Sequence, residues 1–196
     1  SIFFFFLIRF IDHGKKIIFM IYPAIHIIQT ELIFIVPAEV GNIGEILATN
    51  NHGSEKDIII SLVNIEENRI SRDPKNYVRT DTGILMKNPP VHLNLTLLFT
   101  SLKHDTGYQQ ALQNIQHVIE FFQNKYVFDH TNTPDLDEGI EKLILEMISL
   151  NLEQLHQLWS MLGGKYHPSV AYRLRMVTID SVSGVPGPLI QEIETN

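Results

Sequence analysis

Residues 152–180 constrain the fold of this chain more than any other segment. Leu155, Leu158, Trp159 and Leu162 recur at helical spacing, which predicts a short amphipathic helix. Gly163 and Gly164 follow, and glycine tolerates the positive φ that a helix ending often needs. After Pro168 the side chains alternate as in a strand, with Val170, Tyr172, Leu174, Met176 and Thr178 on one face and Ala171, Arg173, Arg175, Val177 and Ile179 on the other. We therefore expect a helix that packs onto a sheet through a glycine corner, with Trp159 in the core between them.

Composition limits the classes of function. The length of 196 residues suits one domain with or without extensions, and 44% hydrophobic residues can build a sizeable core. The net charge of -7 argues against a nucleic-acid partner, because a protein that binds nucleic acid carries a basic stripe. The chain has no cysteine, which excludes disulfides, thiolate metal sites and a cysteine nucleophile.

Other periodic segments predict the rest of the fold. Strand-like alternation occurs at residues 57–66, 91–102 and 142–152, and helical spacing occurs at 17–36 and 106–123. Pro23 fits the first turn of the first helix, and the second helix is expected to bury Leu112, Ile115, Ile119 and Phe122. The expected fold class is α+β, an α/β sandwich-like arrangement with a mixed, roughly four-stranded sheet and helices packed mainly on one face.

A membrane span at residues 17–36 is the less favoured interpretation of that segment. The segment is long enough, but it contains Pro23, His26, Gln29, Thr30 and Glu31. Its apolar residues, among them Ile21, Ile25, Ile28, Leu32 and Ile35, form one helical stripe, as in a helix packed on a core. We therefore expect no membrane partner.

Short motifs give no catalytic or metal signature. Asp135, Asp137 and Glu146 suggest a calcium loop, but glycine stands at 139 and isoleucine at 140, where the loop needs an oxygen ligand and a glycine. Gly163-Gly164-Lys165 lacks the earlier glycine and the following Ser or Thr of a phosphate loop. A solvated acidic turn and a helix ending explain these two motifs, so we predict no catalytic, metal or cofactor-binding residues and no cofactor.

Three blocks of sequence carry a resemblance to a known family. SLVNIEENR occupies residues 61–69, NPPVHLNLTLLF occupies 88–99 and LWSMLGGKYHPS occupies 158–169. In order and spacing they resemble the cap, or tail-terminator, proteins of phage-tail-like contractile injection systems, over about residues 20–180. The resemblance implies a phage tail-terminator-like fold and a non-enzymatic ring, usually of six copies, that closes the distal end of the inner tube and sheath.

That resemblance also implies partners and a location. The partners would be other copies of the chain, the sheath protein and the inner tube protein. Assembly would take place in the bacterial cytoplasm, in a particle that is then released. The residues leave two other functions open, a small soluble α/β enzyme or ligand-binding domain and a membrane-tethered scaffold.

The chain divides into a single domain at residues 20–180 with three appendages. Residues 1–19 are expected to be an N-terminal extension, because seven apolar residues are too few to span a bilayer and the family-like part begins near Met20. A long polar arm at 68–89 and an extended tail at 181–196 are expected to reach neighbouring subunits or sheath. The candidate interface residues are Arg69, Arg72, Arg79, Lys87, Arg173, Arg175, Leu189, Ile190 and Ile193. For Arg173 and Arg175, a partly solvated sheet face is an equally good interpretation.

Overall fold

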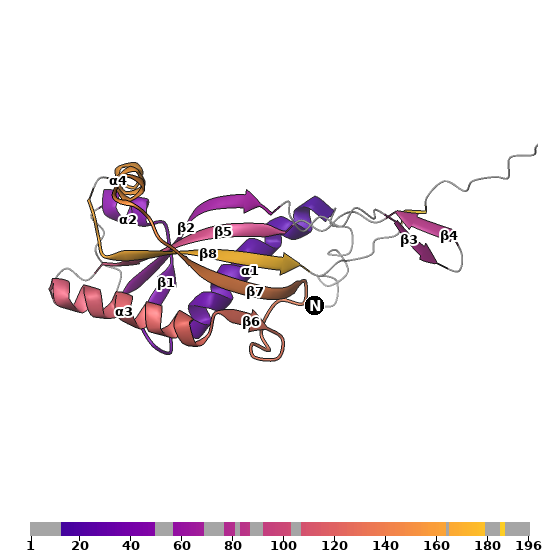
Figure 1. The fold of residues 1–196 in the computed structure, drawn as a ribbon, viewed down its shortest axis with the longest axis horizontal. Helices are drawn as coiled ribbons and strands as arrows, with labels where there is room; N and C mark the ends of the chain where they lie inside the picture. Colours follow the sequence, from indigo (N-terminus) through magenta and orange to yellow (C-terminus); the bar gives the residue numbers. More distant parts are fainter. Residues whose placement is uncertain are drawn as a thin grey trace, which may run out of the picture.

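The structure is a computed structural model that describes residues 13–49, 57–68, 77–80, 83–86, 92–102, 107–163, 165–178 and 185–186. For residues 13–19, 77–80, 83–86 and 185–186 it describes the backbone only. Its main feature is a mixed six-stranded sheet in the order β1-β2-β5-β8-β7-β6 (Figure 1). The strands are β1 (Ala38–Val40), β2 (Ile58–Glu67), β5 (Leu93–Ser101), β6 (Val127–Asp129), β7 (Ile140–Ile148) and β8 (Ser169–Thr178). Only β1 runs parallel to its neighbour.

The α+β class and the mixed sheet are confirmed, with two more strands than predicted. The four predicted strands form the centre of the sheet as β2, β5, β7 and β8. The two additional strands, β1 and β6, are three residues long, too short to show alternation. The predicted end of the strand at 142–152 was wrong. Strand β7 ends at Ile148, and Asn151 is the N-cap of the next helix.

The two long helices lie on one face of the sheet. Helix α1 (His13–Leu32) and helix α3 (Tyr108–Asn124) pack with alternate residues of the central strands into the larger core cluster (Figure 1). On the opposite face, α2 (Ile43–Ala48) and α4 (Leu152–Met161) form a smaller cluster with Ile59, Leu98 and Ala171. The short helices therefore cover one end of the second face and leave the rest of it open.

The buried side of α3 is rotated from the predicted one. Ala111, Asn114, Val118 and Phe122 are buried, whereas Leu112 is exposed and Ile115 and Ile119 are partly exposed. Asn114 explains the error, because its amide donates to the Ser101 hydroxyl at 3.3 Å and so lies in the core despite its polarity. An apolar stripe alone does not identify a buried polar residue that has a partner.

Helix α1 differs from the predicted helix at both ends. It begins at His13, within the segment assigned to the extension, so Pro23 lies inside the helix and not in its first turn. It ends at Leu32, which leaves Ile35 in the following turn and 53% exposed. Among the described residues, no helix is both long and apolar enough to cross a membrane.

A second, three-stranded sheet joins the arm to the tail. Strands β3 (Tyr77–Thr80) and β4 (Gly83–Met86) form an antiparallel hairpin within the arm, and β4 also pairs with β9 (Val185–Pro186) of the tail. Figure 1 draws this sheet apart from the six-stranded sheet. The hairpin lies within the segment that was predicted to be a long arm at 68–89. Pairing between segments about a hundred residues apart in the sequence is not visible in local periodicity.

Candidate assembly surfaces

The open part of the second sheet face carries charge. Within it, Arg173 is aligned with Thr96 on one side and Glu146 on the other, and Arg175 is aligned with Asn94 and Ile144. Alternation along β8 directs Tyr172, Leu174 and Met176 into the core, which leaves both arginines on this face as predicted. The structure thus brings Arg173 and Arg175 together.

Arg175 has an ionic partner among the described residues, and Arg173 has none there. Arg175 donates from Nη2 to Glu146 Oε1 at 2.8 Å, in a pair that is exposed on both sides and therefore contributes at most about 1 kcal/mol. Arg173 is exposed, and within the described part of the chain it forms no ion pair. Its guanidinium is consequently available to a carboxylate of another molecule.

The other predicted interface residues remain predictions. Arg79 lies in β3 opposite Ile84, where only the backbone is described. Six more fall outside the described residues: Arg69, Arg72, Lys87, Leu189, Ile190 and Ile193.

The edge of β2 is a surface that the sequence did not indicate. β1 pairs only with Ile58, Ile59 and Ile60, and then turns away towards α2. Ser61 fixes this departure, because its buried hydroxyl donates to the Gly41 carbonyl at 2.7 Å and accepts from the Ile43 amide at 3.1 Å. From Leu62 onward, the outer edge of β2 has no strand beside it among the described residues. Such an edge can pair with a strand of another chain.

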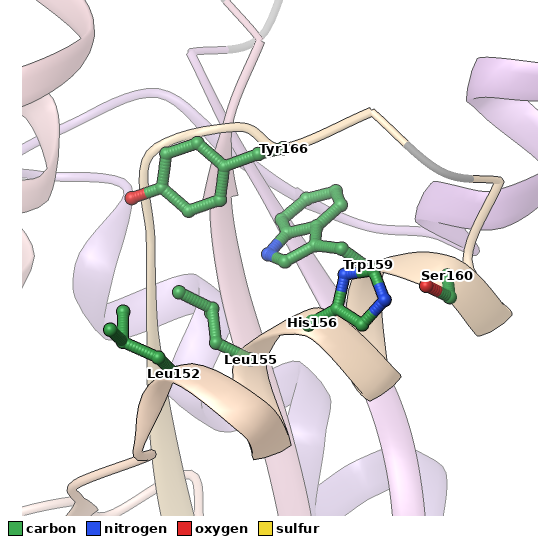
Figure 2. A pocket seen from close by; sticks show the side chains of 6 residues that line it. All are labelled: Leu152, Leu155, His156, Trp159, Ser160 and Tyr166. Atoms are coloured by element: carbon green, nitrogen blue, oxygen red, sulfur yellow. The ribbon is translucent and has the colours of Figure 1, made fainter.

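A hollow of about 280 Å³ lies beside α4. Its lining residues are Leu152, Leu155, His156, Trp159, Ser160 and Tyr166 (Figure 2). Two features of the sequence shape the wall. The side chains of Asn151 and Gln154 each accept from the other's backbone amide, which is a capping box that starts α4. Gly163, with a φ of +115°, ends it and sends the chain back towards Tyr166.

Trp159 lines this hollow and also belongs to the core beneath it. Its side chain is in the smaller core, as predicted, with only 3% of the residue exposed and the Tyr166 ring edge-on at 5.8 Å. Its indole nitrogen is buried and has no hydrogen-bond partner. Figure 2 shows that nitrogen directed between Tyr166 and Leu155, towards the hollow. A buried donor without an acceptor is rare in a folded protein and calls for an explanation.

A second apolar feature is the turn after α1. Ile33, Phe34 and Ile35 are consecutive, and they are 40%, 82% and 53% exposed. Exposed single apolar residues are ordinary, but three in succession form a projecting apolar tip. Nothing in the helical stripe predicted this tip, because the stripe was expected to continue to residue 36.

The acidic turn that contains Asp135 and Asp137 is stabilised by a hydrogen bond within the turn. Asp137 accepts from the Gly139 amide at 2.8 Å, so the aspartate holds its own turn. Among the residues that the structure describes, no cluster of three or more His, Cys, Asp or Glu residues could hold a metal ion.

Comparison with known proteins identifies the family. The sequence model of the Pvc16 N-terminal domain matches residues 27–192. None of the curated proteins compared with the chain matches it. Among solved structures, the chain is similar to the sheath/tube terminator of the PVC extracellular contractile injection system in its extended state. That match has a TM-score of 0.56 and 15% identity over 90% of this chain and 62% of that chain.

The anti-feeding prophage cap, described as a tube-terminating cap, is also similar. The TM-score is 0.56, with 16% identity over 87% of this chain and 59% of that chain. At such identities the likeness shows the fold, and this chain spans only about three fifths of the length of the two structures. The resemblance to the cap proteins of contractile injection systems is thereby confirmed. Because the family model covers most of the sequence, the chain belongs to the Pvc16 N-terminal domain family.

Proposed function

We propose that this chain is the structural terminator of a contractile injection system, with no catalytic role. The observation that carries the proposal is the match of the Pvc16 N-terminal domain over residues 27–192. The fold shared with a sheath/tube terminator and with a tube-terminating cap supports it. In this role the chain binds the last ring of inner tube and sheath at the distal end of the particle.

The physical basis of termination is an asymmetry between two surfaces. A tube or sheath elongates because each added ring presents the same docking surface to the next ring. A cap stops growth when it fits that surface on one side and presents no copy of it on the other. We propose a closed ring of six copies, in which two different patches of each chain meet.

The structure offers surfaces suited to these contacts. Arg173 on the open sheet face can pair with a carboxylate, and the edge of β2 beyond Ile60 can accept a strand from sheath or tube. The three-stranded sheet of arm and tail is a further candidate for contact with the sheath. Assembly in the bacterial cytoplasm, within a particle that is later released, follows from the same proposal.

Removal of the gene tests the function. Particles made without the chain should vary in length or lose order at the distal end, and electron microscopy of negatively stained particles measures both. Expression of the chain from a plasmid should restore uniform, closed ends. Particles of normal length with intact distal ends, made in the absence of the chain, would contradict the proposal.

A further inference from the structure

The exposed tip formed by Ile33, Phe34 and Ile35 is apolar, and so is much of the lining of the hollow beside α4. Phe34 is 82% exposed although it is a large apolar side chain. The hollow, at about 280 Å³, is larger than the cavity of roughly 150 Å³ that is known to accept a benzene ring. It can therefore accommodate one aromatic side chain together with part of a flanking residue.

The unpaired donor of Trp159 completes the match. The indole N–H faces the hollow and has no acceptor. A turn that follows a helix presents backbone carbonyl groups that the helix does not use. An inserted tip would thus supply an acceptor for the indole N–H as well as apolar contact with Leu152, Leu155 and Tyr166.

The two features belong to helices on opposite faces of the sheet. The tip follows α1, which packs on one face through Ile28 and Leu32 of the larger cluster. Helix α4 packs on the other face, where Trp159 belongs to the smaller cluster with Ile43 and Ile59. In Figure 1 the connection from α1 to β1 is at the lower margin and α4 is at the upper margin. One chain cannot fill its own hollow in this arrangement, but it can fill that of a neighbour.

We propose that Phe34 of one copy inserts into the α4 hollow of the next copy, with the Trp159 indole N–H donating to a carbonyl of the inserted turn. The contact is heterologous, since it joins two different patches, and repetition of such a contact closes a ring when the rotation per subunit permits. This inference rests on the proposed function, for which it supplies the contact between subunits. A large side chain in a pocket lined by aromatic residues is typical of an interface hot spot.

Disulfide trapping tests the contact directly, because the chain has no cysteine of its own. Phe34→Cys and Leu152→Cys are made in separate full-length chains that carry different tags. The two proteins are mixed, either without other components or during the assembly of particles, and the mixture is then oxidised mildly. The covalent dimer that contains both tags should form several-fold more than in either control mixture.

Two control variants match the test pair in exposure. Met161→Cys replaces Leu152→Cys, because Met161 is on the same helix and is exposed but does not line the hollow. Tyr22→Cys replaces Phe34→Cys, because Tyr22 is an exposed aromatic residue on α1. If the test pair cross-links no better than the controls, the proposed contact is wrong.

A substitution distinguishes this inference from the function itself. Phe34→Ala should leave the melting temperature of the chain unchanged but weaken ring formation by about thirtyfold or more, as loss of a hot spot does. Sedimentation measures the ring, and electron microscopy measures the particles. Rings that form normally with Phe34→Ala would overturn the inference and leave the terminator function in place.

One outcome would assign the hollow to a different occupant. If Leu152→Ser weakens binding to tube and sheath while self-association is unchanged, the hollow binds another protein and the inference is wrong. Particles with normal ends in the absence of the chain would instead overturn the proposed function, whatever the cross-linking shows.

Discussion

At the scale of single residues, an aromatic cluster links the sheet to α3. Phe99 and Phe122 meet edge-on at 5.3 Å, and the Tyr172 ring lies 5.6 Å from Phe99 and 4.8 Å from Phe122. All three are buried, and they come from β5, α3 and β8. Such pairs add stability beyond the area they bury, so the cluster holds α3 on the central strands.

Phe99 should be among the most sensitive positions in the chain. It is fully buried, so Phe99→Ala should lower the free energy of unfolding by about 3–5 kcal/mol through lost transfer energy and a cavity. Chemical denaturation of the purified chain measures the change. Phe34→Ala removes the same side chain from an exposed site and should change the value by less than about 0.5 kcal/mol. Equal losses in the two variants would contradict the assignment of the core.

Tyr172 should make stability fall at high pH. Burial raises its pKa from 10.0 to about 12 in the folded chain, whereas the unfolded chain keeps the ordinary value. The stabilisation is therefore complete below the unfolded pKa and is lost as the pH rises from 10 to about 12, since the unfolded state releases this proton first.

The matched variant for this effect is Tyr172→Phe, which has no hydroxyl to ionise. Urea denaturation of both proteins at about pH 9 and about pH 11 isolates the contribution of Tyr172 from that of other groups. The free energy of unfolding should fall less steeply in Tyr172→Phe. If the free energy of unfolding changes equally with pH in both proteins, the folded chain does not keep the Tyr172 hydroxyl neutral.

At the scale of elements, Ser61 connects β2 to both β1 and α2. Its hydroxyl binds the Gly41 carbonyl and the Ile43 amide, and Asn42 caps α2 through the Gly44 amide at 3.1 Å. These bonds end β1 after three residues and start α2 on the second face. The open edge of β2 is a direct consequence of this early departure.

Loss of the Ser61 hydroxyl should destabilise the chain measurably. Ser61→Ala leaves the buried Ile43 amide without its acceptor, which costs about 1–3 kcal/mol. Thermal and urea unfolding report the loss. Ser160→Ala deletes an exposed hydroxyl and should have little effect. A native-like unfolding curve for Ser61→Ala would show that another group satisfies the amide.

At the scale of the whole molecule, the second sheet joins strand β9 of the tail to the hairpin β3–β4 of the arm. β9 pairs with β4 through Leu85 opposite Pro186 and Met86 opposite Val185. The six-stranded sheet includes no residue of these strands. Loss of the tail should therefore affect the arm and spare the main core.

Deletion of residues 181–196 should weaken assembly onto the sheath while the main fold persists. Circular dichroism and melting should be close to those of the full chain, and the fraction of capped particles should fall. Deletion of residues 194–196 alone retains β9 and the candidate interface residues Leu189, Ile190 and Ile193, and serves as the control. Correctly capped particles with the longer deletion would exclude a role for the tail.

The periodicity of apolar residues was sufficient to predict strand β8 and helix α4. Strand β8 alternates between the core and the open face, so the places of Tyr172, Leu174 and the two arginines followed from a period of two. The end of α4 at Gly163 and the burial of Trp159 were likewise predicted. In these cases the backbone preference and the apolar pattern agree within one short segment.

Contacts between distant segments required the folded chain. The burial of Asn114 depends on Ser101, the short β1 depends on Ser61, and the pairing of β9 depends on a hairpin about a hundred residues away. The exposed tip at Phe34 and the unpaired Trp159 indole are also consequences of where helices end and pack. Each of these features depends on contacts between residues that are far apart in the sequence. Periodicity shows which side of a helix or strand is apolar, but it does not show which residue of another element that side contacts.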